Sequence, residues 1–440
     1  MLLCPNNHEN LDGLSHCRVC GLPLHDLGAE FASLAEGLSL RCEMGRRAAG
    51  KLLVGLGTVG AGLIETCQAQ YGDSNPECSY VAVDTAETSP LNGSGPILRL
   101  KIGSSDPGAG TFCGVGEEVT RDDPHLLPVF RRAGLNHQDE NQVAFFIAGV
   151  GGGIGSAASV LIEKARRLNP DFHAVALIVV PGLDESFHNQ LNACYALSRL
   201  LDNGGRQAAD TVIALQYDRI KRLRGVGAGG QELAGDGLLS ALTDLLLKNL
   251  SSQYITEIVR INRSAAVNLV VPCLALGRSL EIFASLNNIL ESAVSCSANR
   301  LSPPAVLTCH LLLRVPLNRA SDFGEETVNE QLWSLVRNHF PGVKAVSQAI
   351  TYSDEQHDRI DACILLGGGS AASALFADDS HLADFQEELE RQSSRQPCGL
   401  NQETLKLVSD TLAQYDLALD GLREERKTKK IRTRSVRQRR

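Results

Sequence analysis

Two glycine-rich loops, each between an apolar run and a helical pattern, constrain this chain more than any other feature. The first spans 55–60 and follows the apolar residues 52–54; the second spans 149–155 and follows 144–148. Consecutive glycines let backbone N–H groups turn inward onto a phosphate, and the positive end of the following helix adds its dipole. Both loops therefore predict phosphate binding where a strand ends and a helix begins.

Strand and helix patterns alternate around these loops. The run 174–180 is apolar throughout, as a parallel strand buried on both faces requires, and amphipathic helices are predicted over 156–168 and 191–201. Such alternation is typical of a doubly wound α/β domain with a parallel sheet. The predicted strands of this domain are 52–54, 80–83, 144–148, 174–180 and 211–215.

Beyond this domain the pattern predicts one long central helix and then a second, α+β domain with strands at 305–315, 343–350 and 361–366. Before it, Phe31, Leu34, Leu38 and Cys42 recur at helical spacing. The predicted organisation is a zinc ribbon (1–25), a helical linker (26–50), a nucleotide-binding domain (51–236), the central helix (237–262), the second domain (263–380), a helical segment (381–420) and a basic tail (421–440).

The first 25 residues carry a metal-ligand pattern. Cys4, His8, Cys17 and Cys20 have the spacing C-x3-H-x8-C-x2-C, which suits a tetrahedral, structural Zn²⁺. A segment this short buries too little apolar surface to fold alone, so the metal would supply the folding energy. The pattern resembles the small zinc ribbons at the ends of many bacterial and archaeal proteins, and His16 and His25 are alternative ligands.

Charge and composition narrow the class of protein. The chain has 42 basic and 51 acidic residues, but the tail 421–440 alone carries ten Lys or Arg against two Glu. The acidic body argues against a protein that coats nucleic acid with its whole surface. We find no secretory leader and no apolar run near the ~20 residues of a membrane span, so we expect a cytoplasmic protein.

The first glycine loop taken alone allows a different interpretation. Its G-x-G-x-x-G pattern, with Asp84 ending the next strand, also fits the fingerprint of an NAD-dependent enzyme. That hypothesis leaves the loop 149–155 unexplained. Because no lysine ends the second loop, it is not a Walker loop, and amides with a metal ion would meet the phosphate charge.

The two loops in this order resemble the tubulin/FtsZ superfamily, whose G-G-G-T-G-[ST]-G signature corresponds to Gly151–Ala157 with Ile154 replacing threonine. Residues 81–85, 108–118 and 209–220 resemble further family stretches, and the likeness covers roughly 51–366. It implies bound GTP or GDP with Mg²⁺. The nucleotide-binding residues that we predict are Gly57, Thr58, Val59, Asp84, Thr85, Gly108, Ala109, Gly110, Thr111, Gly151, Gly152, Gly153, Ile154, Gly155, Ser156, Glu185, Tyr217, Asp218 and Asp244.

The family's hydrolysis loop, N-x-D-x-x-[DE], is degenerate here. Members polymerise head to tail, and the acids of one subunit position the attacking water in the next. Starting the pattern at Asn268 puts Val270 and Cys273 at the acid positions, and starting it at Asn262 puts Ser264 and Val267 there. Glu257 is the nearest upstream acid and, with Asn268, a weak catalytic candidate. Losing a general base typically costs about 10²- to 10⁴-fold in rate.

These features predict a GTP-binding, tubulin/FtsZ-like protein that assembles into filaments with slow hydrolysis. The alternative is a hydrolysis-deficient nucleotide-binding scaffold that recruits protein partners through its zinc ribbon and basic tail. The tail at 421–440 has no aromatic residue for base stacking. A solvated tail, an anionic membrane, nucleic acid and the acidic body of another subunit all remain open for it.

Overall fold

The computed structural model describes residues 2–3, 9–10, 38–41, 50–73, 75–85, 97–103, 109–110, 112–135, 142–201, 208–227, 229–265, 267–299, 303–353, 359–368, 374–376, 379–393, 406–410 and 412. The predicted zinc ligands Cys4, His8, Cys17 and Cys20 lie outside the described residues, as does the basic tail at 421–440. Among the described residues, no group of three or more His, Cys, Asp or Glu side chains is placed to hold a metal ion.

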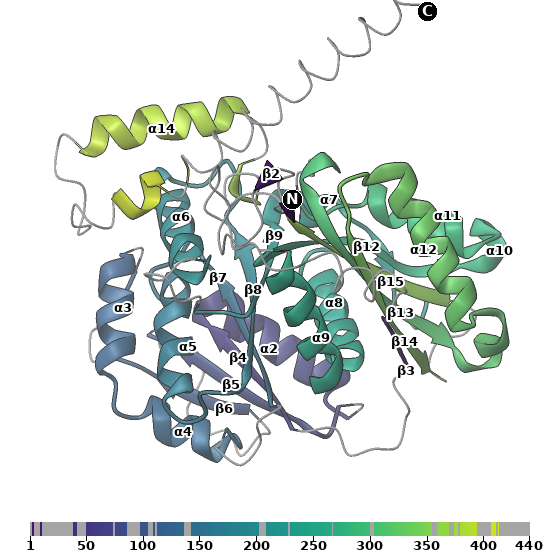
Figure 1. Ribbon diagram of the computed structural model, residues 1–440. Coiled ribbons are helices and arrows are strands. Elements are labelled where there is room, and N and C mark those ends of the chain that lie inside the picture. The colour runs from purple at the N-terminus through teal and green to yellow at the C-terminus, as the bar shows by residue number, and fades with distance from the viewer. Residues whose placement is uncertain are drawn as a thin grey trace, which may run out of the picture.

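One eleven-stranded sheet organises the chain, in the order β3-β14-β13-β15-β12-β9-β8-β7-β4-β5-β6 (Figure 1). Its six strands from β9 to β6 are all parallel, and every predicted strand of the first domain is confirmed among them. Their bounds are β4 Lys51–Leu56, β5 Cys78–Asp84, β6 Ile97–Lys101, β7 Val143–Gly149, β8 His173–Val180 and β9 Thr211–Gln216.

Helices cover both faces of these parallel strands. Alternate side chains of β4 point to opposite faces, so that Leu52 and Val54 join one core while Leu53 joins the other. The first core lies under α3 Cys113–Asp122, α4 Leu126–Arg132, α5 Ala158–Arg166 and α6 Phe187–Leu201. The second lies under α2 Gly57–Tyr71, α8 Asp236–Asn249 and α9 Ser252–Ser264.

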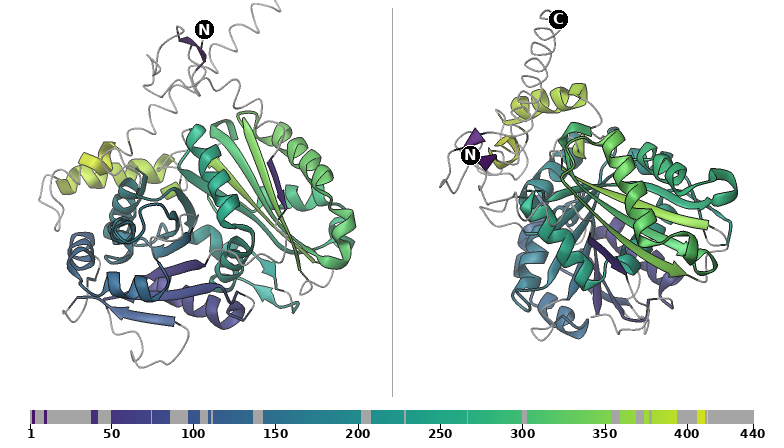
Figure 2. Two further views of the ribbon diagram at one scale, coloured as in Figure 1. Left: turned by 60° about the horizontal axis from the view of Figure 1, so that its bottom comes forward. Right: turned by 45° about the vertical axis from the view of Figure 1, so that its right-hand side comes forward.

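The strands of the predicted second domain continue the same sheet. β12 Leu269–Ser279 pairs with β9 in parallel and with β15 Arg359–Gly368 in antiparallel, and β13 Val306–Pro316 and β14 Ala345–Ser353 follow. Figure 2 shows the helices that cover the outer face of these strands. They are α10 Leu280–Phe283, α11 Leu286–Ser295 and α12 Glu325–His339, and short 3₁₀ turns occupy Pro303–Ala305 and Leu317–Asp322.

Three predictions on secondary structure were wrong. The single long helix is two, because Leu250 leaves the helical conformation and the Ser251 side chain caps the start of α9 by accepting from the Tyr254 amide. Residues 38–41 of the predicted helical linker form strand β3, Leu38–Arg41, whose alternating pattern fits the edge beside β14. We also predicted a hydrolysis loop where the structure forms strand β12, so this strand was missed.

The C-terminal segment packs at the beginning of α6. In α14, Asp379–Ser393, the ring of Phe385 stacks on that of Phe187, with centroids 5.1 Å apart. Figure 1 shows α14 lying across α6 at the beginning of that helix. No helix among the described residues has the length and apolar character needed to cross a membrane.

Candidate functional site

A cavity of about 220 Å³ lies at the carboxyl ends of β4, β5 and β7. These strands are parallel and adjacent, so the loops that follow them meet at one edge of the sheet. Every lining residue except Gly149 is one that we predicted to bind nucleotide. The lining residues are Gly57, Thr58, Val59, Asp84, Thr85, Gly110, Gly149, Gly152, Gly153, Ile154 and Gly155.

The two glycine loops pack so closely that glycine is required at the contact. Gly57 has φ +64°, and a Cβ there would lie 2.7 Å from Cγ2 of Ile154. A Cβ on Gly155 would overlap the carbonyl oxygen of Gly149. The contacting glycines therefore present backbone to the cavity, and the amides at the start of α2 have no intrahelical acceptor.

The cavity also holds a carboxylate. Asp84, at the end of β5, is only 5% exposed; its carboxylate accepts from the Thr85 amide at 2.7 Å and lies 3.3 Å from the Thr58 hydroxyl. The Thr85 hydroxyl in turn accepts from the Ala109 amide at 3.1 Å. These contacts, and the hydrogen bond from the Gly153 amide to the Gly110 carbonyl at 3.0 Å, bring residues 109–110 to the glycine loops.

Several other predicted residues support the cavity without lining it. Ser156 is fully buried and donates to the Gly153 carbonyl at 2.7 Å, and the Gly151 carbonyl accepts from the Asn192 side chain at 2.9 Å. Gly108 and Thr111 lie outside the described residues.

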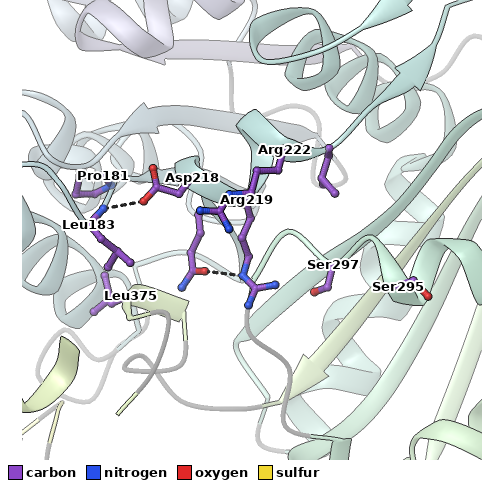
Figure 3. A pocket seen from close by; sticks show the side chains of 10 residues that line it. Pro181, Leu183, Asp218, Arg219, Arg222, Ser295, Ser297 and Leu375 are labelled. Atoms are coloured by element: carbon purple, nitrogen blue, oxygen red, sulfur yellow. Dashed lines mark hydrogen bonds between the residues drawn. The ribbon is translucent and has the colours of Figure 1, made fainter. Parts of the chain in front are cut away.

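Glu185, Tyr217 and Asp218 follow the neighbouring strands β8 and β9. The Glu185 carboxylate accepts from the Gly182 amide at 2.9 Å, and Asp218 accepts from the Leu183 amide at 2.8 Å, so both brace the loop after β8. The Tyr217 ring lies under the Lys221 ammonium, 4.2 Å from the ring centroid. Asp218 also lines a second cavity (Figure 3).

Asp244 is not brought to the cavity between the glycine loops. Its side chain is fully buried on α8, where it accepts from Arg314 of β13 and, at 2.9 Å, from Asn75, which follows the end of α2. Burial works to lower the pKa of Arg314, but the carboxylates of Asp361 and Asp244 outweigh it and raise that pKa. Asp244 thus belongs to a buried ion cluster between α8 and the second half of the sheet.

The predicted hydrolysis loop is not a loop. Asn268 immediately precedes β12, and its carbonyl accepts from the Val212 amide. Val270 and Cys273 are fully buried within β12, as sheet positions require. Asn262 is fully buried on α9 and accepts from Thr308 at 2.8 Å. Neither starting position offers an acid, and both lie in regular, packed structure instead of a loop.

A third start for the pattern N-x-D-x-x-[DE] appears at the junction of α8 and α9. Starting at Asn249, the acid positions hold Ser251 and Tyr254. The junction lies at the amino ends of the strands, since the Lys51 side chain at the start of β4 donates to the Leu247 carbonyl. Glu257, on α9 next to this junction, accepts from Arg260 at 3.0 Å. The sequence pattern did not reveal this start, because Ser251 and Tyr254 fall inside the predicted continuous helix 237–262.

Comparisons with known proteins agree with this architecture. CetZ2 from Haloferax volcanii, solved as a GTPγS-bound protofilament, matches with TM-score 0.61 and 19% identity over 78% of this chain and 99% of that one. CetZ from Methanosaeta thermophila strain DSM 6194 matches with TM-score 0.58 and 12% identity, over 88% and 99%. The fold is that of the tubulin/FtsZ family.

A third structure of this tubulin/FtsZ-like fold, the GDP-bound monomer of CetZ1 from Haloferax volcanii, matches with TM-score 0.58 and 17% identity over 78% of this chain and 99% of that one. The sequence matches no family model and no curated protein. The likeness to the CetZ structures is therefore one of fold, and the chemistry of the site rests on its own residues.

Proposed function

We propose that this chain binds GTP or GDP, with the phosphates in the cavity between the two glycine loops. The observation that carries the proposal is the convergence of both loops on one cavity, with helix N-termini behind them. A dinucleotide fingerprint would need only the loop of β4, whereas here Gly152, Gly153 and Gly155 line the same cavity. The second loop therefore favours a phosphate chain over NAD.

Magnesium fits the donors of this cavity. Asp84 supplies a carboxylate, and Thr58 and Thr85 supply hydroxyls, which are the hard oxygen ligands that Mg²⁺ takes together with phosphates and waters. The ion would neutralise phosphate charge. Without it, the buried Asp84 carboxylate would repel the phosphates, so we expect nucleotide binding to depend on Mg²⁺.

We further propose head-to-tail self-association with slow or absent hydrolysis. The cavity lies at the carboxyl ends of the parallel strands and the α8–α9 junction at their amino ends, so stacked copies would bring the junction of one to the cavity of the next. The acid positions of that junction hold Ser251 and Tyr254. The Tyr254 hydroxyl is buried against Ser347 at 2.9 Å and is not available to orient water.

Two measurements on the full chain test these proposals. Calorimetric titration with GTPγS and GDP, with and without Mg²⁺, should show binding that Mg²⁺ strengthens; no binding at about 100 μM nucleotide would refute the nucleotide site. Phosphate release, pelleting and electron microscopy should then be followed as protein concentration rises. Filaments with little release are expected, whereas release that climbs with concentration would mean that another acid, such as Glu257, acts in hydrolysis.

The missing acids also favour our second candidate, a nucleotide-binding scaffold. In that case the zinc ribbon, with Zn²⁺ on Cys4, His8, Cys17 and Cys20, and the basic tail would recruit partners. Metal analysis of the full chain should give about one zinc per chain, and Cys17→Ser should lose it. Unchanged zinc content in that variant would refute the ribbon.

A further inference from the structure

A second cavity, of about 240 Å³, lies at the carboxyl end of β9, where the two halves of the sheet meet (Figure 3). The first half contributes the loop after β8, the end of β9 and α7 Tyr217–Arg222. The second half contributes the turn after α11, and the C-terminal segment contributes Leu375. The lining residues are Pro181, Leu183, Gln216, Asp218, Arg219, Arg222, Leu223, Ser295, Ser297 and Leu375.

This cavity is separate from the phosphate cavity. The two share no lining residue. Arg219, Arg222 and Leu223 are spaced three and four residues apart, so they lie along one side of α7 and its end. Tyr217 and Lys221 contact each other and do not line this cavity. Of the nucleotide-binding residues predicted from the resemblance, Asp218 alone lines this cavity, and its carboxylate already accepts from the Leu183 amide. A ligand here would therefore leave the proposed phosphate site open.

The charges at this cavity favour an anion. Two guanidinium groups, Arg219 and Arg222, face one carboxylate, and that carboxylate of Asp218 already accepts from the Leu183 amide at 2.8 Å. The Gln216 side chain accepts from Arg219 Nε at 3.1 Å and holds that side chain in place. Arg222 has no ion-pair or hydrogen-bond partner within the part of the chain that the structure describes.

A nearby arginine shows what a paired side chain looks like in this segment. Arg224, two residues along, forms an ion pair with Glu232 at 2.9 Å. Among the residues that the structure describes, Arg222 has no such acid, although acidic residues outnumber basic ones in this chain, 51 to 42. A planar guanidinium matches a carboxylate or phosphate group through paired N–H donors. The guanidinium of Arg222 is thus available to an anion that enters the cavity.

The remaining walls are apolar and the space is small. Pro181, Leu183, Leu223 and Leu375 supply aliphatic surface to the same cavity. About 240 Å³ is below the usual range for sites that take whole drug-sized ligands or cofactors. We propose that this cavity binds a small organic anion, with its carboxylate or phosphate group at Arg219 and Arg222 and a compact apolar body against Leu375.

The test uses the full chain and three probes: phenyl phosphate, benzoate and inorganic phosphate. Calorimetry and ligand-detected NMR should show that phenyl phosphate or benzoate binds more tightly than inorganic phosphate, because only the first two fill the apolar walls. Which of the two binds tighter identifies the anionic group. Saturating GTPγS should leave the probe affinity unchanged; displacement of the probe by the nucleotide would overturn a separate site.

Paired variants test the arginines. Arg222→Gln should weaken the probe at least about tenfold, the loss expected for one charge-assisted hydrogen bond. Arg224→Gln removes the same charge two residues away and should bind the probe as the unmodified chain does. Because Arg222 is exposed, its replacement should leave the circular dichroism spectrum unchanged. Equal losses in both variants, no loss in Arg222→Gln, or no probe binding at about 10 mM would overturn the proposal.

Discussion

The buried Asp244 offers the sharpest test of the site assignment, because resemblance and geometry give it different roles. The family pattern would have it contact the nucleotide, whereas the structure pairs it with Arg314, Asn75 and, at 3.6 Å, Lys248. Asp244→Asn keeps the shape but removes the charge. Arg314 keeps its contact with the Asp361 carboxylate in this variant. We therefore expect the free energy of unfolding to fall by an amount near the lower end of the ~3–5 kcal/mol typical of breaking a buried ion pair.

The expected shift in melting temperature follows from chain length. At about 2.1 cal/mol/K per residue, the 440 residues unfold with an entropy of roughly 0.9 kcal/mol/K, so ~3 kcal/mol lowers Tm by about 3 °C. Scanning calorimetry measures this shift, and titration with GDP measures affinity, which should not change.

A matched control lies on the same helix. Asp236 is the exposed first residue of α8, and Asp236→Asn should cost under about 1 kcal/mol, the usual size of a helix-terminus charge effect. A tenfold loss of GDP affinity in Asp244→Asn, with Tm unchanged, would refute our assignment and return this side chain to the nucleotide site.

Three further outcomes are expected. Gly155→Ala should reduce the affinity for GDP by more than about tenfold, because the added Cβ overlaps the Gly149 carbonyl. Gly62→Ala, whose added Cβ meets open space, should bind GDP as the unmodified chain does. Equal GDP affinities of the two variants would contradict the role given to the glycine packing. Burial lowers the pKa of His310 to about 3, so below pH 6.5 the unfolded chain binds a proton that the folded chain does not. The free energy of unfolding should therefore fall by up to ~1.4 kcal/mol per pH unit as the pH drops from about 6.5 towards 3. In urea titrations, His310→Gln should reduce the dependence of the unfolding free energy on pH. An unchanged dependence would contradict this role of His310. Burial raises the pKa of the Cys113 thiol to about 11. At pH 8, iodoacetamide should therefore label Cys113 about a hundredfold more slowly in the folded chain than after unfolding. Mass spectrometry of the peptide that contains Cys113 measures the two labelling rates.

The meeting of the two glycine loops at one cavity was largely predictable from the sequence because its parts are local. The pattern of strand, glycine loop and helix is contained in a stretch of about ten residues. Parallel neighbouring strands place the loops that follow them at the same edge of the sheet, independently of the rest of the chain. The residues 57–59, 84–85 and 152–155 were therefore all identified before the fold was known. The lack of acids in the expected hydrolysis loop was also visible, since neither Asn262 nor Asn268 as a starting residue supplies a carboxylate.

Tertiary structure alone decided which distant residues meet. Asp244 and Arg314 are 70 residues apart, and the sequence near either residue gives no sign that the two side chains pair. A fully apolar stretch such as β12 is ambiguous by itself, and its pairing with β9 and β15 makes it a strand. The second cavity likewise exists only because the end of β9, the turn after α11 and Leu375 pack together. Sequence periodicity reports which face of an element is buried, but long-range packing sets what that face is buried against.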